Sequence, residues 1–219
     1  MEFASKIIEI KRETKDTVTV RIKAVNFNFK AGQFVNLFLK IGEKEIKRPY
    51  SISSSPSEKD YIEITSKRFG VFSTYLDELA EIGEEVKIQG PFGLFTYNNE
   101  EFNKAIFIAA GSGIAPIRGI IKTILGKNIE LYYSVKTEED VIYKNEIESW
   151  NKNKNFKSKI IFTRENGKRI DEGFLKENIK FDDKTLFYVC GPPAFVKDIV
   201  EILKKIGAKQ ERIKTERFG

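Results

Sequence analysis

The sequence predicts two domains, an N-terminal antiparallel β-barrel followed by an α/β domain with a parallel five-stranded sheet. Up to about Gln89, short strand-like segments alternate with turn residues and only one helix interrupts them, which is typical of a small antiparallel barrel. From Asn103 onward, strands alternate with helices, which indicates a parallel sheet covered on both faces. Residues 98–101 are polar and separate the two patterns. We therefore expect the domains to span residues 1–98 and 103–219.

The first half contains six predicted strands, recognised by alternation of apolar and polar residues between turn-forming residues. They are Ile7–Arg12, Thr17–Ala24, Gln33–Ile41, Ile46–Ser53, Tyr61–Lys67 and Glu85–Gln89. One helix is predicted over Phe72–Glu81.

The second half contains five shorter, more apolar strands, as expected for strands buried on both faces. They are Ala105–Ala110, Ile129–Ser134, Lys159–Thr163, Thr185–Cys190 and Ile213–Glu216. Helical periodicity predicts helices over Ile114–Leu125, Asn145–Trp150 and Ala194–Ile206.

The composition removes several kinds of chemistry. The chain of 219 residues has no histidine and one cysteine, Cys190, which excludes histidine-based triads, the usual zinc sites, disulfides and a protein-held iron–sulfur cluster. It has no apolar run of the ~20 residues needed to cross a bilayer, and its N-terminus lacks the apolar core of a signal peptide. We therefore expect a cytoplasmic protein without a membrane partner, and any chemistry must use hydroxyls, carboxylates, the single thiol or a bound cofactor.

The formal net charge of +6 favours an acidic partner, such as a nucleotide, an acidic protein or a nucleic acid. Binding to nucleic acid would use exposed aromatic residues as stacking platforms. Phe27, Phe29, Phe34 and Phe38 suit core and turn positions better, so we expect no nucleic-acid partner.

Arg48, Pro49, Tyr50 and Ser51 combine a guanidinium, an aromatic ring and a hydroxyl on one predicted strand. Side chains alternate faces along a strand, so Arg48 and Tyr50 should point one way and Ser51 the other. Arginine pairs bidentately with phosphate oxygens. The segment therefore suits a cofactor with a phosphate and a flat ring system, although an exposed edge strand would look similar.

A glycine turn, Gly111–Ser112–Gly113, follows the first strand of the second half and opens a helix that contains Pro116. Such a turn lets a phosphate approach backbone N–H groups at the positive end of a helix dipole. The order of strand, glycine turn and helix is that of dinucleotide-binding sites. Pro116 replaces the third glycine of the usual fingerprint, and a tight turn without a ligand is the alternative interpretation.

Three further segments fit such a site. Gly70, Val71 and Ser73 stand at a predicted helix start, and the triplet Cys190, Gly191, Pro192 ends the fourth strand of the sheet. Glu216 and Phe218 lie near the C-terminus. A capping serine, a small buried thiol and a terminal tail are the corresponding structural interpretations.

The segments described above and the turn Gly90–Gly93 make six motifs: Arg48–Ser51, Gly70–Ser73, Gly90–Gly93, Gly111–Pro116, Cys190–Pro193 and Glu216–Phe218. In this order and spacing they resemble the motifs of the ferredoxin-NADP reductase superfamily of flavin-dependent reductases. The resemblance covers nearly the whole chain and implies a flavin-binding barrel followed by an NAD(P)-binding domain with strand order 3-2-1-4-5.

On the flavin side, the resemblance implies that Arg48 and Ser73 bind the pyrophosphate, that Tyr50 packs on the flavin ring, and that the Ser51 hydroxyl lies near flavin N5. Phe218 resembles the terminal aromatic residue that covers the flavin until nicotinamide displaces it. The full set of candidate flavin-binding residues is Arg48, Pro49, Tyr50, Ser51, Thr65, Gly70, Val71, Ser73 and Phe218.

On the nicotinamide side, the resemblance places the pyrophosphate on the turn Gly111–Pro116 and Cys190 beside the nicotinamide ring. Glu216 would lie near Ser51 and Cys190, and these three are the candidate catalytic residues. The candidate NAD(P)-binding residues are Gly111, Ser112, Gly113, Pro116, Thr163, Arg164, Cys190, Gly191 and Pro192.

We expect FAD rather than FMN, because Arg48 and Ser73 would together hold a diphosphate. NADP is favoured over NAD by Thr163 and Arg164, a hydroxyl and a cation that follow the third strand, where an NAD site would more often offer a carboxylate. Lys136 and Arg169 are further candidates for the 2′-phosphate.

The resemblance thus implies a flavoprotein that transfers hydride between NAD(P)H and FAD. We expect it to pass electrons to a separate, acidic one-electron carrier such as ferredoxin or flavodoxin. Two alternatives stay open: an electron-transfer subunit that acts only within a larger complex, and a reductase of free flavin.

Overall fold

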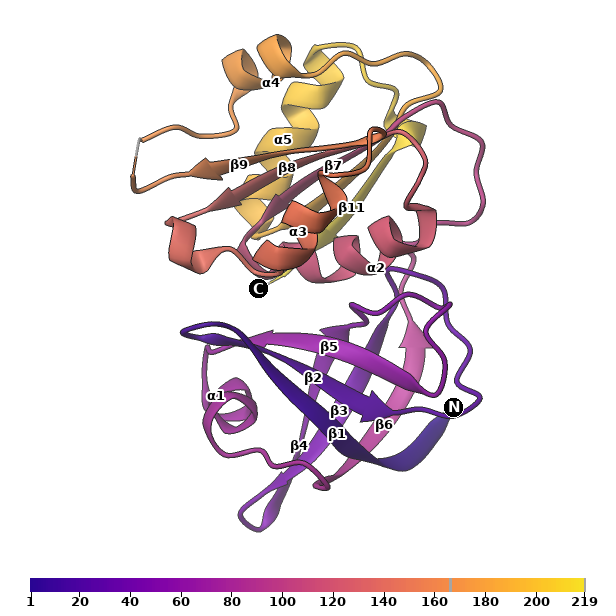
Figure 1. Ribbon diagram of the computed structural model, residues 1–219, viewed down its shortest axis with the longest axis vertical. Coiled ribbons are helices and arrows are strands. Elements are labelled where there is room, and N and C mark those ends of the chain that lie inside the picture. Colours follow the sequence, from indigo (N-terminus) through magenta and orange to yellow (C-terminus); the bar gives the residue numbers. More distant parts are fainter. Residues whose placement is uncertain (166, 219) are drawn as a thin grey trace. The chain divides into compact units, whose positions relative to one another are not determined.

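The computed structural model describes residues 1–165 and 167–218, which divide into two compact units (Figure 1). The first unit consists of Met1–Asn98 together with Arg118–Thr123. The second contains the rest of the described chain. The predicted fold class, an antiparallel barrel followed by an α/β domain, is confirmed by the sheets described next.

Six antiparallel strands form the sheet of the first unit, in the order β4-β3-β6-β1-β2-β5. They are β1 (Glu2–Thr14), β2 (Thr17–Lys23), β3 (Phe34–Ile41), β4 (Lys44–Ser51), β5 (Tyr61–Lys67) and β6 (Glu85–Phe92). A bridge between Ile52 and Ile64 links the segment after β4 to β5, so the two ends of the sheet meet and the barrel closes. β4 ends at Ser51 rather than at the predicted Ser53.

β1 is the longest strand of the barrel and has two partners in succession. Glu2–Lys6 pair with β6, and the part from Ile7 to Thr14 pairs with β2, with irregular register near both ends of the second pairing. The sequence predicted only the second part, Ile7–Arg12. Inward-facing residues such as Val18, Val20, Leu37 and Ile88 fill the barrel and form its core.

Helix α1 (Val71–Glu78) packs against this core through Phe72 and Leu76. It ends three residues before the predicted Glu81. Its last turn carries the buried Asp77, which accepts a hydrogen bond from Arg12 at 2.8 Å. Leu79 and Ile82 beyond its end are exposed.

The second unit contains a five-stranded parallel sheet. Its strands are β7 (Ala105–Ala110), β8 (Ile129–Val135), β9 (Phe156–Phe162), β10 (Leu186–Gly191) and β11 (Ile213–Arg217). Their order is β11-β10-β7-β8-β9, which is the strand order 3-2-1-4-5 that the resemblance implied. All four neighbouring pairs are parallel, so the carboxyl ends of all five strands meet at one edge.

Helices cover both faces of this sheet (Figure 1). α4 (Glu172–Asn178) and α5 (Pro193–Lys205) lie on one face, and α3 (Lys144–Trp150) and the start of α2 (Ile114–Ile124) on the other. Short 3₁₀ turns, η1 (Gly111–Gly113), η2 (Glu138–Asp140) and η3 (Gln210–Arg212), connect strands and helices. The sequence did not predict α4, a helix of seven residues.

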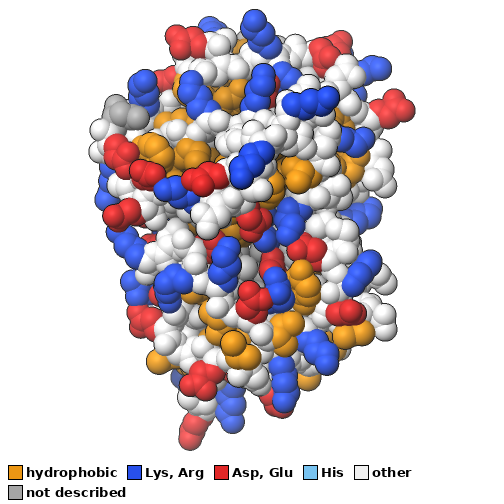
Figure 2. Space-filling view, in the orientation of Figure 1, with side chains coloured by type: hydrophobic (Ala, Val, Ile, Leu, Met, Phe, Trp, Pro, Cys, Tyr) orange, Lys and Arg blue, Asp and Glu red, His pale blue; other side chains and the backbone are white. Residues whose placement is uncertain are grey.

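Charges of both signs are interspersed over the face of the molecule shown in Figure 2. A nucleic-acid-binding surface would instead gather Lys and Arg into a patch. Among the helices of the described residues, none has the length and apolar character that crossing a bilayer requires.

Candidate functional site

In the first unit, the candidate site begins at the end of β4, where Ser51 has a buried hydroxyl. Ser51 is 7% exposed, and its Oγ has no hydrogen-bond partner within the described part of the chain. A buried polar atom without a partner costs about 1–3 kcal/mol, so native proteins rarely keep one without a reason. The Ser51 hydroxyl is therefore suited to a partner from outside the chain.

The side chain of Tyr50, a residue of β4, lies between β5 and α1. Its hydroxyl is 3.1 Å from the Ser66 Oγ, and its ring packs on Phe72 with 5.7 Å between the centroids. Burial raises the pKa of the Tyr50 phenol, with the Ser66 hydrogen bond acting in the opposite direction. The ring is held on two sides but only half-buried, so an aromatic face is available next to Ser51.

Arg48 and Pro49 are exposed, and the Arg48 guanidinium donates only to the neighbouring Lys47 carbonyl, at 2.8 Å, among the hydrogen bonds of the described residues. A guanidinium with most of its five donors directed to solvent can bind a phosphate without breaking a structural contact.

The start of α1 forms the second predicted phosphate site. Gly70 has φ +121°, in the region that favours glycine, and Val71 is exposed. The Ser73 Oγ accepts from the Phe69 amide at 2.7 Å and donates to the Gly70 carbonyl at 3.1 Å. Its proton is therefore already used, so the N–H groups of the first helical turn, rather than the Ser73 hydroxyl, are the donors that face outward.

Thr65 on β5 is placed differently from the other predicted ligands. Its hydroxyl lies 2.9 Å from the Thr19 Oγ1 and 3.3 Å from the Ser53 Oγ, in a buried hydroxyl cluster. These contacts show a structural role in joining β2, β5 and the segment after β4.

Sequence reasoning missed Arg118 and Glu63, which hold that same segment in place. The Arg118 guanidinium is buried, pairs with the Glu63 carboxylate and donates to the Ser53 carbonyl at 3.0 Å. Arg118 is the main cause that lowers the pKa of Glu63, against the effect of burial. Next to Arg118, Gly119 lets the helix approach closely, because a Cβ there would be 2.8 Å from the Ser54 carbonyl oxygen.

In the second unit, the glycine turn lies at the carboxyl end of β7 as predicted. Gly111 has φ +53°, and its carbonyl oxygen accepts from the Tyr133 hydroxyl at 2.9 Å and from the Ile114 amide. Ser112 is half-buried, and Pro116 lies in the first turn of α2, where its missing N–H costs no helical hydrogen bond.

Two close approaches fix this turn against the end of β10. A Cβ at Gly113 would be 2.4 Å from the Cys190 carbonyl oxygen, and one at Gly191 would be 3.0 Å from the Ala110 Cβ. Only glycine fits at Gly113 without a backbone movement. The turns after β7 and β10 therefore pack directly on one another, and Pro192 follows as the N-cap of α5.

Cys190 and Glu216 are register partners on β10 and β11. Burial raises the pKa of the Cys190 thiol, and the Glu216 charge adds to this, so the thiol is protonated and does not act as a thiolate nucleophile. Burial also raises the pKa of Glu216 to about 7. The Glu216 Oε2 is buried and has no hydrogen-bond partner within residues 1–165 and 167–218. It is the second unpartnered polar atom among the predicted site residues.

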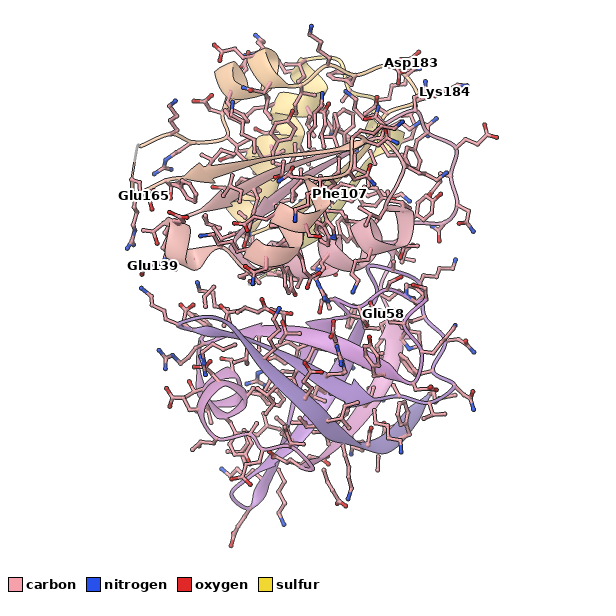
Figure 3. The ribbon with its side chains drawn as sticks, viewed as in Figure 1. Glu58, Phe107, Glu139, Glu165, Asp183 and Lys184 are labelled. Atoms are coloured by element: carbon pink, nitrogen blue, oxygen red, sulfur yellow. The ribbon has the colours of Figure 1, made fainter. Side chains whose placement is uncertain are left out.

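The predicted 2′-phosphate site lies where β8 and β9 end. The Arg164 amide donates to the Lys136 carbonyl at 2.9 Å, so the backbones of these two exposed residues are adjacent where the strands end. The Thr163 hydroxyl donates to the Val135 carbonyl at 3.1 Å and is thus engaged. Glu165 lies at this edge of the sheet with Glu139, opposite the edge with Asp183 and Lys184 (Figure 3).

The Glu165 carboxylate accepts from the Glu138 amide at 2.7 Å, which uses one of its oxygens. Arg169, the other candidate for the 2′-phosphate, is exposed.

The C-terminal candidate Phe218 is held by its backbone: its amide donates to the Gly191 carbonyl at 3.0 Å. Phe218 is thus attached beside the turn that contains Gly191.

The donors of each unit fit the cofactors that the sequence implied. The first unit offers a guanidinium with free donors, a helix N-terminus, an aromatic face and an unpartnered hydroxyl, which match a phosphate and a flat ring with hydrogen-bonding atoms. The second offers a glycine turn at a helix start, which suits the pyrophosphate of a pyridine dinucleotide, and two exposed cations at the same sheet edge.

Comparison with known proteins agrees with this division. The oxidoreductase FAD-binding domain matches residues 5–97, and the oxidoreductase NAD-binding domain matches residues 107–201. The NADH-cytochrome b5 reductase 1 of Dictyostelium discoideum is 32% identical over 84% of this chain and 69% of its own length. The flavohemoprotein of Bacillus subtilis is 29% identical over 97% of this chain, which spans 58% of that relative.

Solved structures show the same fold. The FAD/NAD-binding domain of nitric oxide dioxygenase from Vibrio cholerae has a TM-score of 0.90 at 22% identity, covering 99% of this chain and 98% of that one. The ferredoxin NADP+ reductase from Neisseria gonorrhoeae with bound FAD and NADP has a TM-score of 0.87 at 25% identity, with the same coverage. The chain therefore belongs to the ferredoxin-NADP reductase superfamily of FAD-dependent NAD(P)H oxidoreductases.

Proposed function

We propose that this chain accepts hydride from NAD(P)H on a bound FAD and passes the electrons to a separate acceptor. The observation that carries the proposal is the buried, unpartnered hydroxyl of Ser51 at the end of β4, beside the half-exposed ring of Tyr50. When bound, the flavin supplies the hydride-accepting chemistry, and the protein contributes alignment and electrostatics.

In the first unit, Ser51 donates a hydrogen bond to the flavin ring and Tyr50 supports one face of that ring. Arg48 and the first-turn amides of α1 bind the phosphates, with Gly70 allowing the close approach of the backbone. Because Arg48 and α1 offer two separate anion sites, a diphosphate, and hence FAD, fits better than FMN. Pro49, Val71, Ser73 and Thr65 shape this site rather than donate to the cofactor.

In the second unit, the turn from Gly111 to Pro116 binds the pyrophosphate of the dinucleotide. Cys190 lines the nicotinamide site with a small thiol that is protonated and therefore neutral. Glu216 holds or releases a proton at its unpartnered Oε2, because its pKa of about 7 lets both forms exist near neutral pH. Gly191, Pro192 and Phe218 complete the region around Cys190.

NADPH is the preferred nucleotide in this proposal, because Lys136 and Arg164 are exposed basic residues whose backbones are hydrogen-bonded to each other at the sheet edge. The Thr163 hydroxyl donates its proton to the Val135 carbonyl, which holds the backbone next to Arg164, so this proton is not available to the nucleotide. Replacement Arg164→Ala should raise the KM for NADPH several-fold and leave that for NADH nearly unchanged. Lys157→Ala, which removes a cation elsewhere on β9, serves as the control. Equal changes for both nucleotides in the Arg164 variant would remove the basis for the preference.

The acceptor is a separate one-electron carrier, such as a ferredoxin or flavodoxin, or a partner subunit. Support comes from the relatives: the propane 2-monooxygenase reductase component of Mycolicibacterium goodii is 27% identical over 99% of this chain. The glycine betaine monooxygenase reductase subunit of Chromohalobacter salexigens is 28% identical over 97% of it. The chain spans 68% and 63% of these two relatives, so further parts of such proteins have no counterpart within it.

The test is a visible spectrum of the purified protein, followed by NADPH or NADH addition without air. We expect a yellow protein that is bleached by nucleotide and that then reduces a one-electron dye. A protein that takes up no FAD, or whose FAD no nucleotide reduces, would contradict the proposal. Bleaching without dye reduction would indicate a subunit that needs its complex, and release of reduced free flavin would indicate a free-flavin reductase.

A further inference from the structure

We propose that Tyr133 is a positioning residue for the dinucleotide: its buried hydroxyl fixes the orientation of the peptide unit between Gly111 and Ser112 and so aims the turn's amides at the pyrophosphate. This inference rests on the proposed function. It concerns a residue of β8, which lies outside every motif that identified the site.

Tyr133 is fully buried on β8, next to β7 in the sheet. Its hydroxyl donates to the Gly111 carbonyl at 2.9 Å. Burial raises the pKa of the phenol, and the Ile142 backbone, which hydrogen-bonds to it, acts in the opposite direction. The phenol therefore keeps its proton at every physiological pH and stays a donor to Gly111.

The orientation of this carbonyl determines where the next amide points. In a trans peptide unit, the C=O and the following N–H point in opposite directions. With the Gly111 oxygen directed at Tyr133, the Ser112 N–H is directed away from the buried phenol. Gly111 is at φ +53°, and a Cβ there would meet nothing within 4 Å, so the space beside its Cα is open and no steric contact on that side fixes the peptide unit.

Two bonds hold the carbonyl, and they differ in origin. The Ile114 amide donates to it within the short 3₁₀ turn, which is a local contact of the turn itself. Tyr133 donates from another strand, 22 residues away in sequence. The local bond moves with the turn, whereas the tyrosine anchors the turn to the sheet. Losing the tyrosine hydroxyl would therefore leave the turn formed but free to tilt.

The chain offers a matched control in Tyr132. Its hydroxyl also donates to a backbone carbonyl, that of Asn178 at 2.8 Å, but it belongs to the opposite face of the sheet. Tyr132→Phe and Tyr133→Phe each remove one hydroxyl of this kind from β8. The Tyr132 hydroxyl also lies 3.1 Å from the Glu130 Oε2, and that of Tyr133 also bonds to the Ile142 backbone, so urea unfolding measures the loss of stability in each variant separately. Only Tyr133→Phe should alter nucleotide binding.

The experiment measures reduction of the FAD-loaded protein at several NADPH and NADH concentrations without air. Binding of NADP+ and NAD+ is titrated separately, so that affinity is known independently of electron transfer. We expect Tyr133→Phe to weaken binding of NADP+ and NAD+ by the same factor, about fivefold for one net hydrogen bond. The limiting reduction rate and FAD content should stay within about twofold of the wild type. The common factor separates this effect from loss of a 2′-phosphate contact, which acts on NADP+ alone.

Unchanged binding in Tyr133→Phe, an equal loss in Tyr132→Phe, or a fall confined to the limiting rate would each overturn the inference. A wild-type protein that binds NADP+ but does not reduce its FAD would refute the proposed function, and the binding titration would still decide the role of Tyr133. A wild-type protein that binds neither nucleotide would refute both.

Discussion

Glu216 should make the second unit less stable as the pH rises through neutrality, which is the opposite of the usual behaviour of a paired carboxylate. Its pKa is raised from 4.5 to about 7 by burial. Between these values the folded protein binds more protons than the unfolded chain, so the free energy of unfolding falls as pH increases. The stabilisation is complete below pH 4.5 and is lost above about pH 7.

The size of this effect follows from the two pKa values. At about 1.4 kcal/mol for each pH unit, the difference between 4.5 and about 7 gives at most about 3 to 4 kcal/mol. The side chain keeps some contact with water, so we expect 1 to 3 kcal/mol, with ~1 kcal/mol as the smallest result consistent with burial as the cause. Replacement Glu216→Gln removes the charge and should remove this pH dependence.

Trp150, the only tryptophan of the chain, provides the assay because it is buried in α3 of the same unit. Urea unfolding is followed by its fluorescence at pH 4.5 and pH 8, with FAD at the same excess in every sample. The unfolding free energy of the wild type minus that of Glu216→Gln should fall by 1 to 3 kcal/mol between these pH values. The exposed Glu211, changed to Gln, is the control and should show no such fall. A difference that is constant within about 0.5 kcal/mol, or that rises with pH, would refute the reasoning.

Three further predictions concern other parts of the site. Gly113→Ala places a Cβ 2.4 Å from the Cys190 carbonyl oxygen, so it should lower the free energy of unfolding by about 1–3 kcal/mol. It should also abolish tight NADPH binding while FAD stays bound. An NADPH titration like that of the wild type would contradict the close packing. Arg118→Met leaves the Glu63 carboxylate buried with fewer partners and should cost about 3 kcal/mol in urea unfolding, and adding Glu63→Gln should recover part of it. A double variant no more stable than the single one would argue against a buried charge as the cause. Ser51→Ala should slow FAD reduction by NADPH at least about tenfold and change the Kd for FAD little, and parallel losses of both would count against its role at the flavin ring.

The sequence was sufficient for the fold because its periods differ clearly between the halves. Alternation in β2 and β5 and the apolar runs of β7 and β10 identified two kinds of sheet, and the turn at Gly111 joined strand to helix as predicted. Helix α4 was missed, although a signal existed: Asp171 caps it by accepting from the Phe174 amide at 2.8 Å.

The site was harder to predict where the chemistry depends on contacts distant in sequence. The motif residues themselves could be named, but the hydroxyls of Ser73, Thr163 and Thr65 make internal bonds that no local pattern reveals. Arg118 and Glu63 are 55 residues apart, and a cation in an apolar helix is ordinarily assumed to face water. Residue type is visible in a sequence, whereas the direction of a hydroxyl proton is set by tertiary structure.

The divided pairing of β1 has a practical consequence for preparing this protein. Glu2–Lys6 pair with Glu85–Gln89 on one side of β6, with Ser5 opposite Val86 and Phe3 opposite Ile88. A version shortened by six residues would keep every cofactor motif, but it would present an open strand edge on β6. Open strand edges pair readily with other chains. Aggregation of the shortened protein would therefore reflect the loss of the β1 segment that pairs with β6, and it would say nothing about cofactor affinity.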